Sequence, residues 1–172
     1  VELDVEESHK TSRKYAELSA SNVLMVNDSD TNLHVLDHYL TSWNMPHVGH
    51  KNPFEAVDMF RAAAEAGRPF NLLLLDSQMP GMDGLTLTRT IRAMTDVEQP
   101  SIVLLSSGLT TLSEAQDAGV NIVLSKPVRH DRLFDCLAGF LIKKNSEEDE
   151  KSDTFARRRK RLGAEANRYE SP

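Results

Sequence analysis

The chain has 172 residues, of which 40% are hydrophobic and 27% are charged, and its formal net charge is −6. This composition fits one soluble globular domain with flanking segments, and the negative charge argues against nucleic acid as the main partner of the folded part. A single cysteine, Cys136, excludes an intrachain disulfide framework, and the sequence has neither a membrane-spanning run nor a signal-peptide pattern. We therefore expect a cytoplasmic protein without membrane contact in this segment, and the first residue, Val1, suggests a fragment or a processed form.

Residues 1–21 are polar and charged, so we expect a linker there, mostly disordered or partly helical, that adds nothing to the core. Residues 23–26 predict a short buried strand. A helix is expected at about 30–43, because apolar residues recur at spacings of three and four: Leu33, Leu36, Leu40 and Trp43. His34 and His38 lie one turn apart at metal-ligand spacing, but nothing nearby completes a site, and we favour a solvated helix face.

The centre of the chain carries the most informative stretch. Residues 72–75 are four leucines in a row, a pattern typical of a strand that is buried on both faces in a parallel sheet. The run ends at Asp76, and a Pro-Gly pair and an Asp-Gly pair then turn the chain. A carboxylate at the carboxyl end of such a strand lies where open α/β sheets bind ligands. The simpler interpretation of Asp76 is a turn former or helix cap.

The remaining elements alternate regularly. Further strands are expected at 46–50 (a weak candidate), 101–105 and 121–124, and further helices at 53–67, 84–94, 111–119 and 130–143. Asn52 can cap the second helix, and Thr111 with Glu114 forms a capping-box pattern. Five strands alternating with five helices through short connections indicate βαβ crossovers, and hence an α/β fold with a doubly wound parallel sheet.

Beyond about residue 145 the composition changes. An acidic block at 147–153 precedes a basic cluster, Arg157–Arg161, and large apolar residues nearly vanish. We therefore divide the chain into the linker 1–21, a folded domain at 22–144 and a charged disordered tail at 145–172. The basic cluster could contact nucleic acid, anionic lipid or a localisation receptor. Since no aromatic residues interrupt it, we favour a solvated linker whose two charged blocks partly neutralise each other.

Four polar side chains each follow a predicted strand: Asp28, Asp76, Ser106 and Lys126. The carboxyl ends of parallel strands lie on one edge of the sheet, so these side chains can converge. Paired carboxylates invite a divalent cation, and oxygen ligands favour Mg²⁺. A carboxylate polarised in this way can attack phosphorus, while the metal, the ammonium group and the hydroxyl neutralise the phosphoryl oxygens. Taken singly, Ser106 could be a turn residue and Lys126 a surface charge.

Four motifs resemble the receiver domain of two-component signalling proteins over about residues 22–143. They are Val-Asn-Asp-Ser at 26–29, Leu-Leu-Asp-Ser-Gln-Met-Pro-Gly-Met-Asp-Gly at 74–84, Leu-Leu-Ser-Ser-Gly at 104–108 and Leu-Ser-Lys-Pro at 124–127. Gly-Arg-Pro-Phe at 67–70 and Ser-Lys-Pro-Val at 125–128 most resemble receivers of hybrid sensor histidine kinases. The resemblance implies a five-stranded flavodoxin-like sheet with strand order 2-1-3-4-5.

The resemblance also implies roles for individual residues. Asp76 would accept a phosphoryl group from a histidine kinase or a histidine phosphotransfer domain, possibly in cis. Ser106 would be the switch hydroxyl, Lys126 would bind the phosphate, and the Lys126–Pro127 bond would be cis. The domain itself would catalyse only its own phosphorylation and dephosphorylation.

Mg²⁺ would be held by Asp28, Asp76 and the main-chain carbonyl of Gln78, with Asn27 acting through a water molecule. The family usually has two adjacent acids after the first strand, and here the first is Asn27, which should weaken the metal site. The family also often has an aromatic residue where this chain has Val123. A switch would therefore have to use the backbone around 106–108.

Two other functions compete with the phosphoacceptor. A degenerate receiver could dock a partner without phosphorylation, and Asn27 and Val123 support that alternative. An aspartyl-phosphate phosphatase would need an acid two residues after the nucleophile, where this chain has Gln78. A flavin or dinucleotide site is excluded, because no Gly-x-Gly-x-x-Gly follows the first strand.

Overall fold

The computed structural model describes residues 2–166, and the side chains of residues 5–160. Its five strands are β1 (Val23–Val26), β2 (His47–His50), β3 (Leu72–Asp76), β4 (Ser101–Ser106) and β5 (Ile122–Ser125). All pair in parallel in the order β2-β1-β3-β4-β5. The predicted fold class and strand order are thus confirmed, with β3 at the centre because its leucines are buried on both faces.

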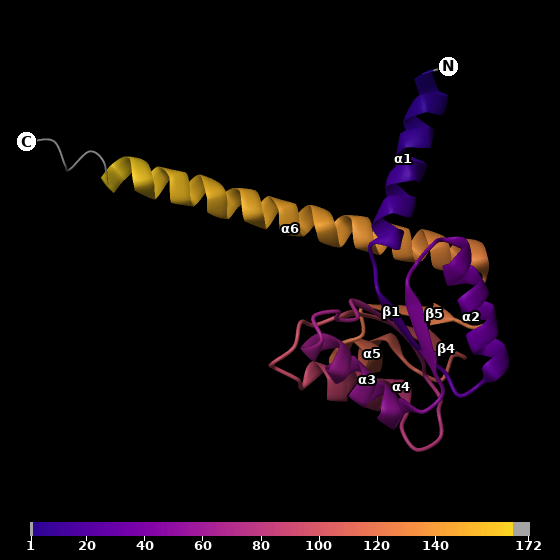
Figure 1. Ribbon diagram of the computed structural model, residues 1–172. Coiled ribbons are helices and arrows are strands. Elements are labelled where there is room, and N and C mark those ends of the chain that lie inside the picture. The colour runs from indigo at the N-terminus through magenta and orange to yellow at the C-terminus, as the bar shows by residue number, and fades with distance from the viewer. Residues whose placement is uncertain (1, 167–172) are drawn as a thin grey trace, which may run out of the picture.

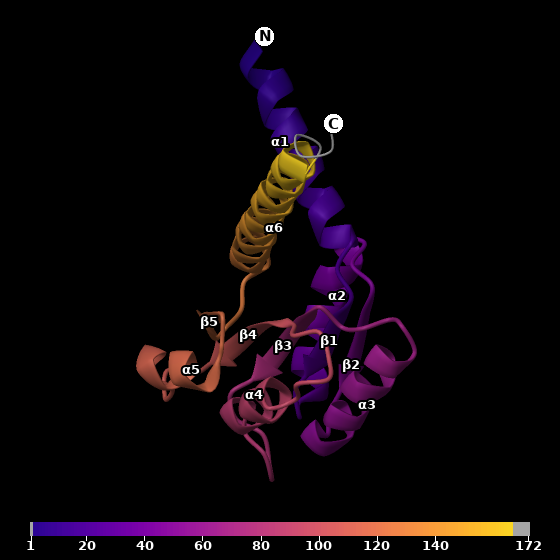
Figure 2. The same ribbon diagram turned by 90° about the vertical axis from the view of Figure 1, so that its left-hand side faces the viewer.

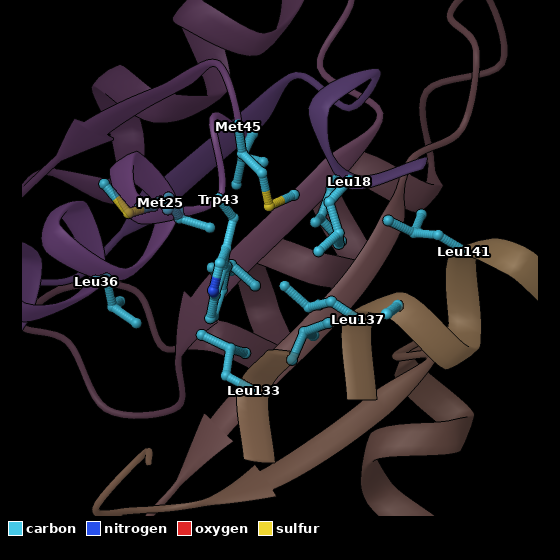
Figure 3. Close-up of a cluster of buried hydrophobic side chains, with 14 of the residues drawn as sticks. Leu18, Met25, Leu36, Trp43, Met45, Leu133, Leu137 and Leu141 are labelled. Carbon is cyan, nitrogen blue, oxygen red and sulfur yellow. The ribbon is translucent and has the colours of Figure 1, made fainter. Parts of the chain in front are cut away.

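Helices cover both faces of the sheet (Figure 1). The first helix, α1, spans Glu2–Ser19 and is followed by α2 (Asp30–Ser42), α3 (Pro53–Glu65), α4 (Gly84–Arg92), α5 (Leu112–Ala118) and α6 (His130–Ala166). One core layer joins α2 and α6 to the sheet, and the other joins α3, α4 and α5 to it. Figure 3 shows this first layer, in which Trp43 reaches toward Leu133 of α6 and Met45 lies beside Leu18 of α1.

The predicted helix starts are confirmed. Ser29 caps α2, and Asn52 caps α3 with Pro53 in its first turn. Thr111 and Glu114 form the capping box of α5. The hydrogen bonds that Glu114 accepts from the backbone and side chain of Thr111 lower the pKa of its carboxyl group. These caps begin each helix directly after a loop, so the loops at the carboxyl edge of the sheet stay short.

The N-terminal segment differs from the expected linker. It forms α1, and Leu18 at its end is fully buried in the α2/α6 core layer. The rings of Tyr15 and Phe134 lie 5.2 Å apart, and the side-chain amide of Asn145 donates to Glu17. The prediction that this segment adds nothing to the core is therefore wrong. This contact cannot be recognised from the sequence pattern, because a single leucine at the end of a polar helix is enough to pack α1 against the core.

The last helix also differs from its predicted end near residue 143. It continues to Ala166 and projects from the sheet, as both views show (Figure 2). Over residues 145–166 the structure thus has a helix where we expected a disordered tail, and residues 167–172 of that predicted tail lie outside the described part of the chain. Residues 141–162 contain neither proline nor glycine and many good helix formers, and Asp153 pairs with Arg157 one turn later at 2.7 Å. The domain boundaries at 22 and 144 stay a prediction.

We expect Leu18→Ala to lower the free energy of unfolding by about 2–4 kcal/mol, because it leaves a cavity between α1 and the core. Urea unfolding followed by circular dichroism measures this loss. Val5→Ala is the matched control, since Val5 lies on the same helix and is 55% exposed. Equal effects of the two substitutions would contradict a docked α1.

No helix within residues 2–166 combines the length and the apolar character needed to cross a membrane. Cys136 is free and half-buried, and this burial raises the pKa of its thiol.

Candidate functional site

The site is built on Asp76, the last residue of β3. The carboxylate is buried, with the residue 3% exposed, and it forms an ion pair with the ammonium group of Lys126. The backbone N–H of Gln78 donates to Oδ1 of Asp76 at 3.3 Å. A buried carboxylate needs such partners, because removal from water otherwise disfavours its charge. The structure thus brings together Asp76 and Lys126, which lie 50 positions apart in the chain.

Ser106, the last residue of β4, lies beside this pair in the sheet. It is buried, and its hydroxyl oxygen accepts a hydrogen bond from the N–H of Gly108 at 3.2 Å. Its carbonyl oxygen accepts from the N–H of Lys126 at 2.8 Å, so the end of β4 holds the backbone of the lysine. Gly108 has φ +97°, a conformation that favours glycine, and this lets the loop turn directly after the hydroxyl.

The end of β1 supplies one buried amide and one exposed acid. Asn27 is 1% exposed, and its Oδ1 accepts from the N–H of Ser29 at 3.0 Å. Asp28, the next residue, is exposed at the same edge. The described side chains contain no group of three or more His, Cys, Asp or Glu residues placed to hold a metal ion. Within this described part of the chain, the pair His34 and His38 therefore gains no third ligand.

The backbone after β5 and before α4 shapes the site. The Lys126–Pro127 bond is cis, as the resemblance implied. Gly84 begins α4 after the turn that follows Asp76, and its N–H donates to the carbonyl of Ser77 at 3.1 Å. A Cβ atom at Gly84 would lie 2.3 Å from the carbonyl oxygen of Asp76. Sequence reasoning treated this glycine only as a turn signal, although no side chain fits there.

A cavity of about 520 Å³ opens beside the site and was missed by the sequence analysis. Asn27 and Lys126 line its polar end, and Val35, Tyr39 and Val128 line its apolar part. The hydroxyl of Tyr39 donates to the carbonyl of Val128 at 3.3 Å and joins α2 to the segment after β5. Only the spacing of Val35 and Tyr39, four positions apart on α2, hinted at a shared surface.

The sequence that forms this sheet and its functional edge matches a known family. Residues 23–138 match the model of the response regulator receiver domain. The chain belongs to this receiver family. The matched residues include all five strands and the acidic, hydroxyl and lysine side chains at their ends.

Several curated relatives of this receiver domain are sensor or histidine kinases. The chain is 28% identical over 119 residues to the autoinducer 2 sensor kinase/phosphatase LuxQ of Vibrio parahaemolyticus, covering 69% of the chain and 13% of that protein. It is 28% identical over 120 residues to the osmosensing histidine protein kinase SLN1 of Saccharomyces cerevisiae, covering 69% of the chain and 10% of that protein. The chain therefore spans only a small part of these relatives, and it is related to receivers of hybrid histidine kinases.

Solved structures share the fold of this receiver domain. The receiver domain of sensor histidine kinase PA1611 from Pseudomonas aeruginosa has a TM-score of 0.61 at 24% identity, covering 70% of this chain and 97% of that one. That receiver domain has a magnesium ion coordinated in its active site cleft. The chemotaxis protein CheY4 of Vibrio cholerae has a TM-score of 0.61 at 22% identity, covering 68% of this chain and 95% of that one.

Proposed function

We propose that this receiver domain accepts a phosphoryl group from a phosphohistidine onto Asp76 and switches conformation to relay or regulate a two-component signal within a hybrid histidine kinase. The observation that carries the proposal is the buried carboxylate at the end of the central strand, paired with Lys126. A nucleophile next to a positive charge at the carboxyl edge of a parallel sheet suits attack on a phosphorylated partner. The kinase relatives support the same partner class, a histidine kinase or phosphotransfer domain in trans or in cis.

In the proposed transfer, an Asp76 carboxylate oxygen forms a bond to phosphorus while the phosphorus–nitrogen bond of the phosphohistidine breaks. The ammonium group of Lys126 moves from the carboxylate to a phosphoryl oxygen. Its positive charge then stabilises the negative charge of the phosphoryl group. The Ser106 hydroxyl gives up the acceptor role that it plays toward Gly108 and donates to a second phosphoryl oxygen. Loss of that contact frees the loop at 106–108, and the loop carries the switch because Val123 provides no aromatic ring.

The residues at this edge fit Mg²⁺ by the chemistry of their donors. Asp28, Asp76 and the main-chain carbonyl of Gln78 are oxygen ligands, and Asn27 would accept from a metal-bound water; this ion prefers such a set together with several waters. When bound, Mg²⁺ would neutralise charge on the phosphoryl group. The PA1611 receiver, which has a magnesium ion coordinated in its active site cleft, supports the assignment. We also place the chain in the cytoplasm, and we assign no nucleic acid to the folded domain.

A second function, phosphorylation-independent docking, is favoured by one observation. Asn27 is buried and already bound to the N–H of Ser29, so one of the usual acids is replaced by an amide with a structural role. In that case the cavity beside Lys126 would serve partner binding alone. The two functions differ in their dependence on Asp76, since docking would be unchanged by Asp76→Asn.

We expect the wild-type chain to gain one phosphoryl group from a small-molecule phosphodonor only when Mg²⁺ is present, as measured by intact mass. Asn27→Asp should tighten Mg²⁺ binding by at least about tenfold, because a unit negative charge about 4 Å from a divalent ion adds roughly 2 kcal/mol of attraction even at the dielectric constant of water. Calorimetric titration with Mg²⁺ measures the affinity, and the labelling rate should rise with it.

Gln116→Glu is the matched control for added charge, because Gln116 is an exposed residue of α5 outside the site. It should change neither the Mg²⁺ affinity nor the labelling rate. Mg²⁺ binding without a phosphoryl adduct from any donor would overturn the phosphoacceptor proposal in favour of docking. Equal labelling with and without Mg²⁺ would show that phosphoryl uptake does not require the metal.

A further inference from the structure

The projecting part of α6 carries two opposite charged segments on one helix. The acidic segment is Glu147–Glu150, four acids in succession, and the basic segment is Arg157–Lys160, four basic residues in succession. All eight side chains are exposed. Figure 1 shows this part of α6 extending away from the sheet and from the other helices. Among the described side chains of 147–160, a single ion pair forms, between Asp153 and Arg157, so within this part of α6 the two charged segments do not pair with each other.

We propose that this part of α6 pairs with the same part of a second copy of the chain, in antiparallel orientation. The centres of the two segments lie ten residues apart, about 15 Å along the helix. A two-fold axis near residues 153 and 154 then sets the acidic segment of each copy against the basic segment of the other. Parallel pairing would set acid against acid, so the charge pattern selects the antiparallel arrangement.

Phe155 provides the apolar centre of this interface. Its side chain is 71% exposed, and it lies within two residues of the proposed axis. Shallow hollows flank it: one is lined by Ala156, Arg159 and Lys160, and the other is lined by Glu147, Glu150, Lys151 and Thr154. The phenylalanine of one copy can enter a hollow of the other, in the manner of knobs-into-holes packing. Glu148 lies seven positions before Phe155 and therefore on the same face, opposite Arg159 of the second copy.

The interface is small and mainly electrostatic, so the dimer should be weak and dependent on salt. The Debye length falls from about 10 Å at 0.1 M salt to about 3 Å at 1 M, which screens exposed charges from one another. Dimerisation does not involve the phosphoacceptor. It should therefore be the same in Asp76→Asn, and its failure would leave the proposed phosphoryl transfer untouched.

The test is analytical ultracentrifugation of the 172-residue chain with two charge variants. The acidic variant carries Arg157→Glu, Arg158→Glu, Arg159→Glu and Lys160→Glu, and the basic variant carries Glu147→Lys, Glu148→Lys, Asp149→Lys and Glu150→Lys. The wild type should dimerise with rising concentration at low salt, and each variant alone should be monomeric. An equimolar mixture should restore the dimer, because every segment then meets its opposite.

Phe155→Ala gives a second measurement that leaves the charges intact. It should weaken the dimer roughly tenfold, whereas Phe54→Ala, at a phenylalanine of α3 that is 54% exposed, should have no effect. A wild-type chain that stays monomeric at every concentration and salt would overturn the proposal, as would variants that dimerise alone or a mixture that does not. A monomer that instead binds short duplex DNA or anionic vesicles would give the basic segment another partner and refute self-pairing.

Discussion

Asp76→Asn abolishes phosphoryl uptake, and this is the largest functional effect that we expect. An amide oxygen carries no full negative charge and is a far weaker nucleophile than a carboxylate, so the covalent step loses its attacking group. The hydrogen bond from the N–H of Gln78 can persist, because the amide oxygen accepts it as the carboxylate oxygen does. The variant should therefore keep its fold while losing its chemistry.

Intact mass after incubation with a small-molecule phosphodonor and Mg²⁺ measures this effect. Asp83→Asn is the matched control, because Asp83 is an exposed acid that caps α4 in the loop after the site. Asparagine caps helices as well as aspartate does, so this variant should fold and take up the phosphoryl group normally. A phosphoryl adduct on the Asp76→Asn chain would show that another residue is the acceptor.

The same variant separates the two candidate functions. If the chain docks a histidine kinase or phosphotransfer domain without phosphorylation, its affinity for that partner is equal in wild type and Asp76→Asn. If phosphorylation drives the switch, the difference in partner affinity between phosphorylated and unphosphorylated wild type disappears in the variant. Partner affinity measured with and without phosphodonor distinguishes these outcomes.

Gly84→Ala should destabilise the chain although it adds only one methyl group. The added Cβ atom would lie 2.3 Å from the carbonyl oxygen of Asp76 and 2.6 Å from Cδ1 of Leu104. Both neighbours are held rigidly, the first by the backbone of β3 and the second by the core. The start of α4 must therefore move away from the sheet, which should cost about 1–3 kcal/mol of unfolding free energy.

Urea unfolding of Gly84→Ala and Gly139→Ala measures this effect against a matched control. Gly139 lies within α6 on the exposed side, and a Cβ atom there meets nothing within 4 Å. Alanine should stabilise the chain at Gly139 by roughly 0.5–1 kcal/mol, because glycine is unfavourable inside a helix. Opposite signs for the two substitutions are the expected result, and equal stability of Gly84→Ala and wild type would contradict the close approach.

Phosphoryl uptake by Gly84→Ala adds a functional measurement. The atom that the new methyl group would meet is the carbonyl oxygen of Asp76 itself, so any part of the strain that β3 takes up reaches the phosphoacceptor. We expect slower labelling than in wild type under conditions in which the variant remains folded, as monitored by circular dichroism. Unchanged labelling would mean that α4 moves and the strand end does not.

Much of the site could be predicted from the sequence because it depends on local patterns. The leucine run before Asp76 marks a buried parallel strand, and parallel strands bring their carboxyl ends to one edge whatever the intervening segments contain. That rule places Asp76 and Ser106 together and brings Lys126 to the same edge. The structure agrees, since Lys126 contacts the carboxylate directly. The capping residues Asn52 and Thr111 were also predictable, because a cap satisfies backbone groups of its own helix.

Other features depended on contacts between distant segments. Leu18 looks like an isolated leucine in a polar helix, and only the fold places it against α6, where it is fully buried. The hydrogen bond between Asn27 and Ser29, the cavity beside Lys126 and the closeness of Gly84 to Asp76 follow from packing that no local pattern records. The sequence by itself determined the sheet and the chemistry at its edge, because hydrophobic runs and strand ends are local. Only the tertiary structure decided which residues pack around the site and restrict its geometry. Burial and close contacts between distant segments exist only once the chain has folded.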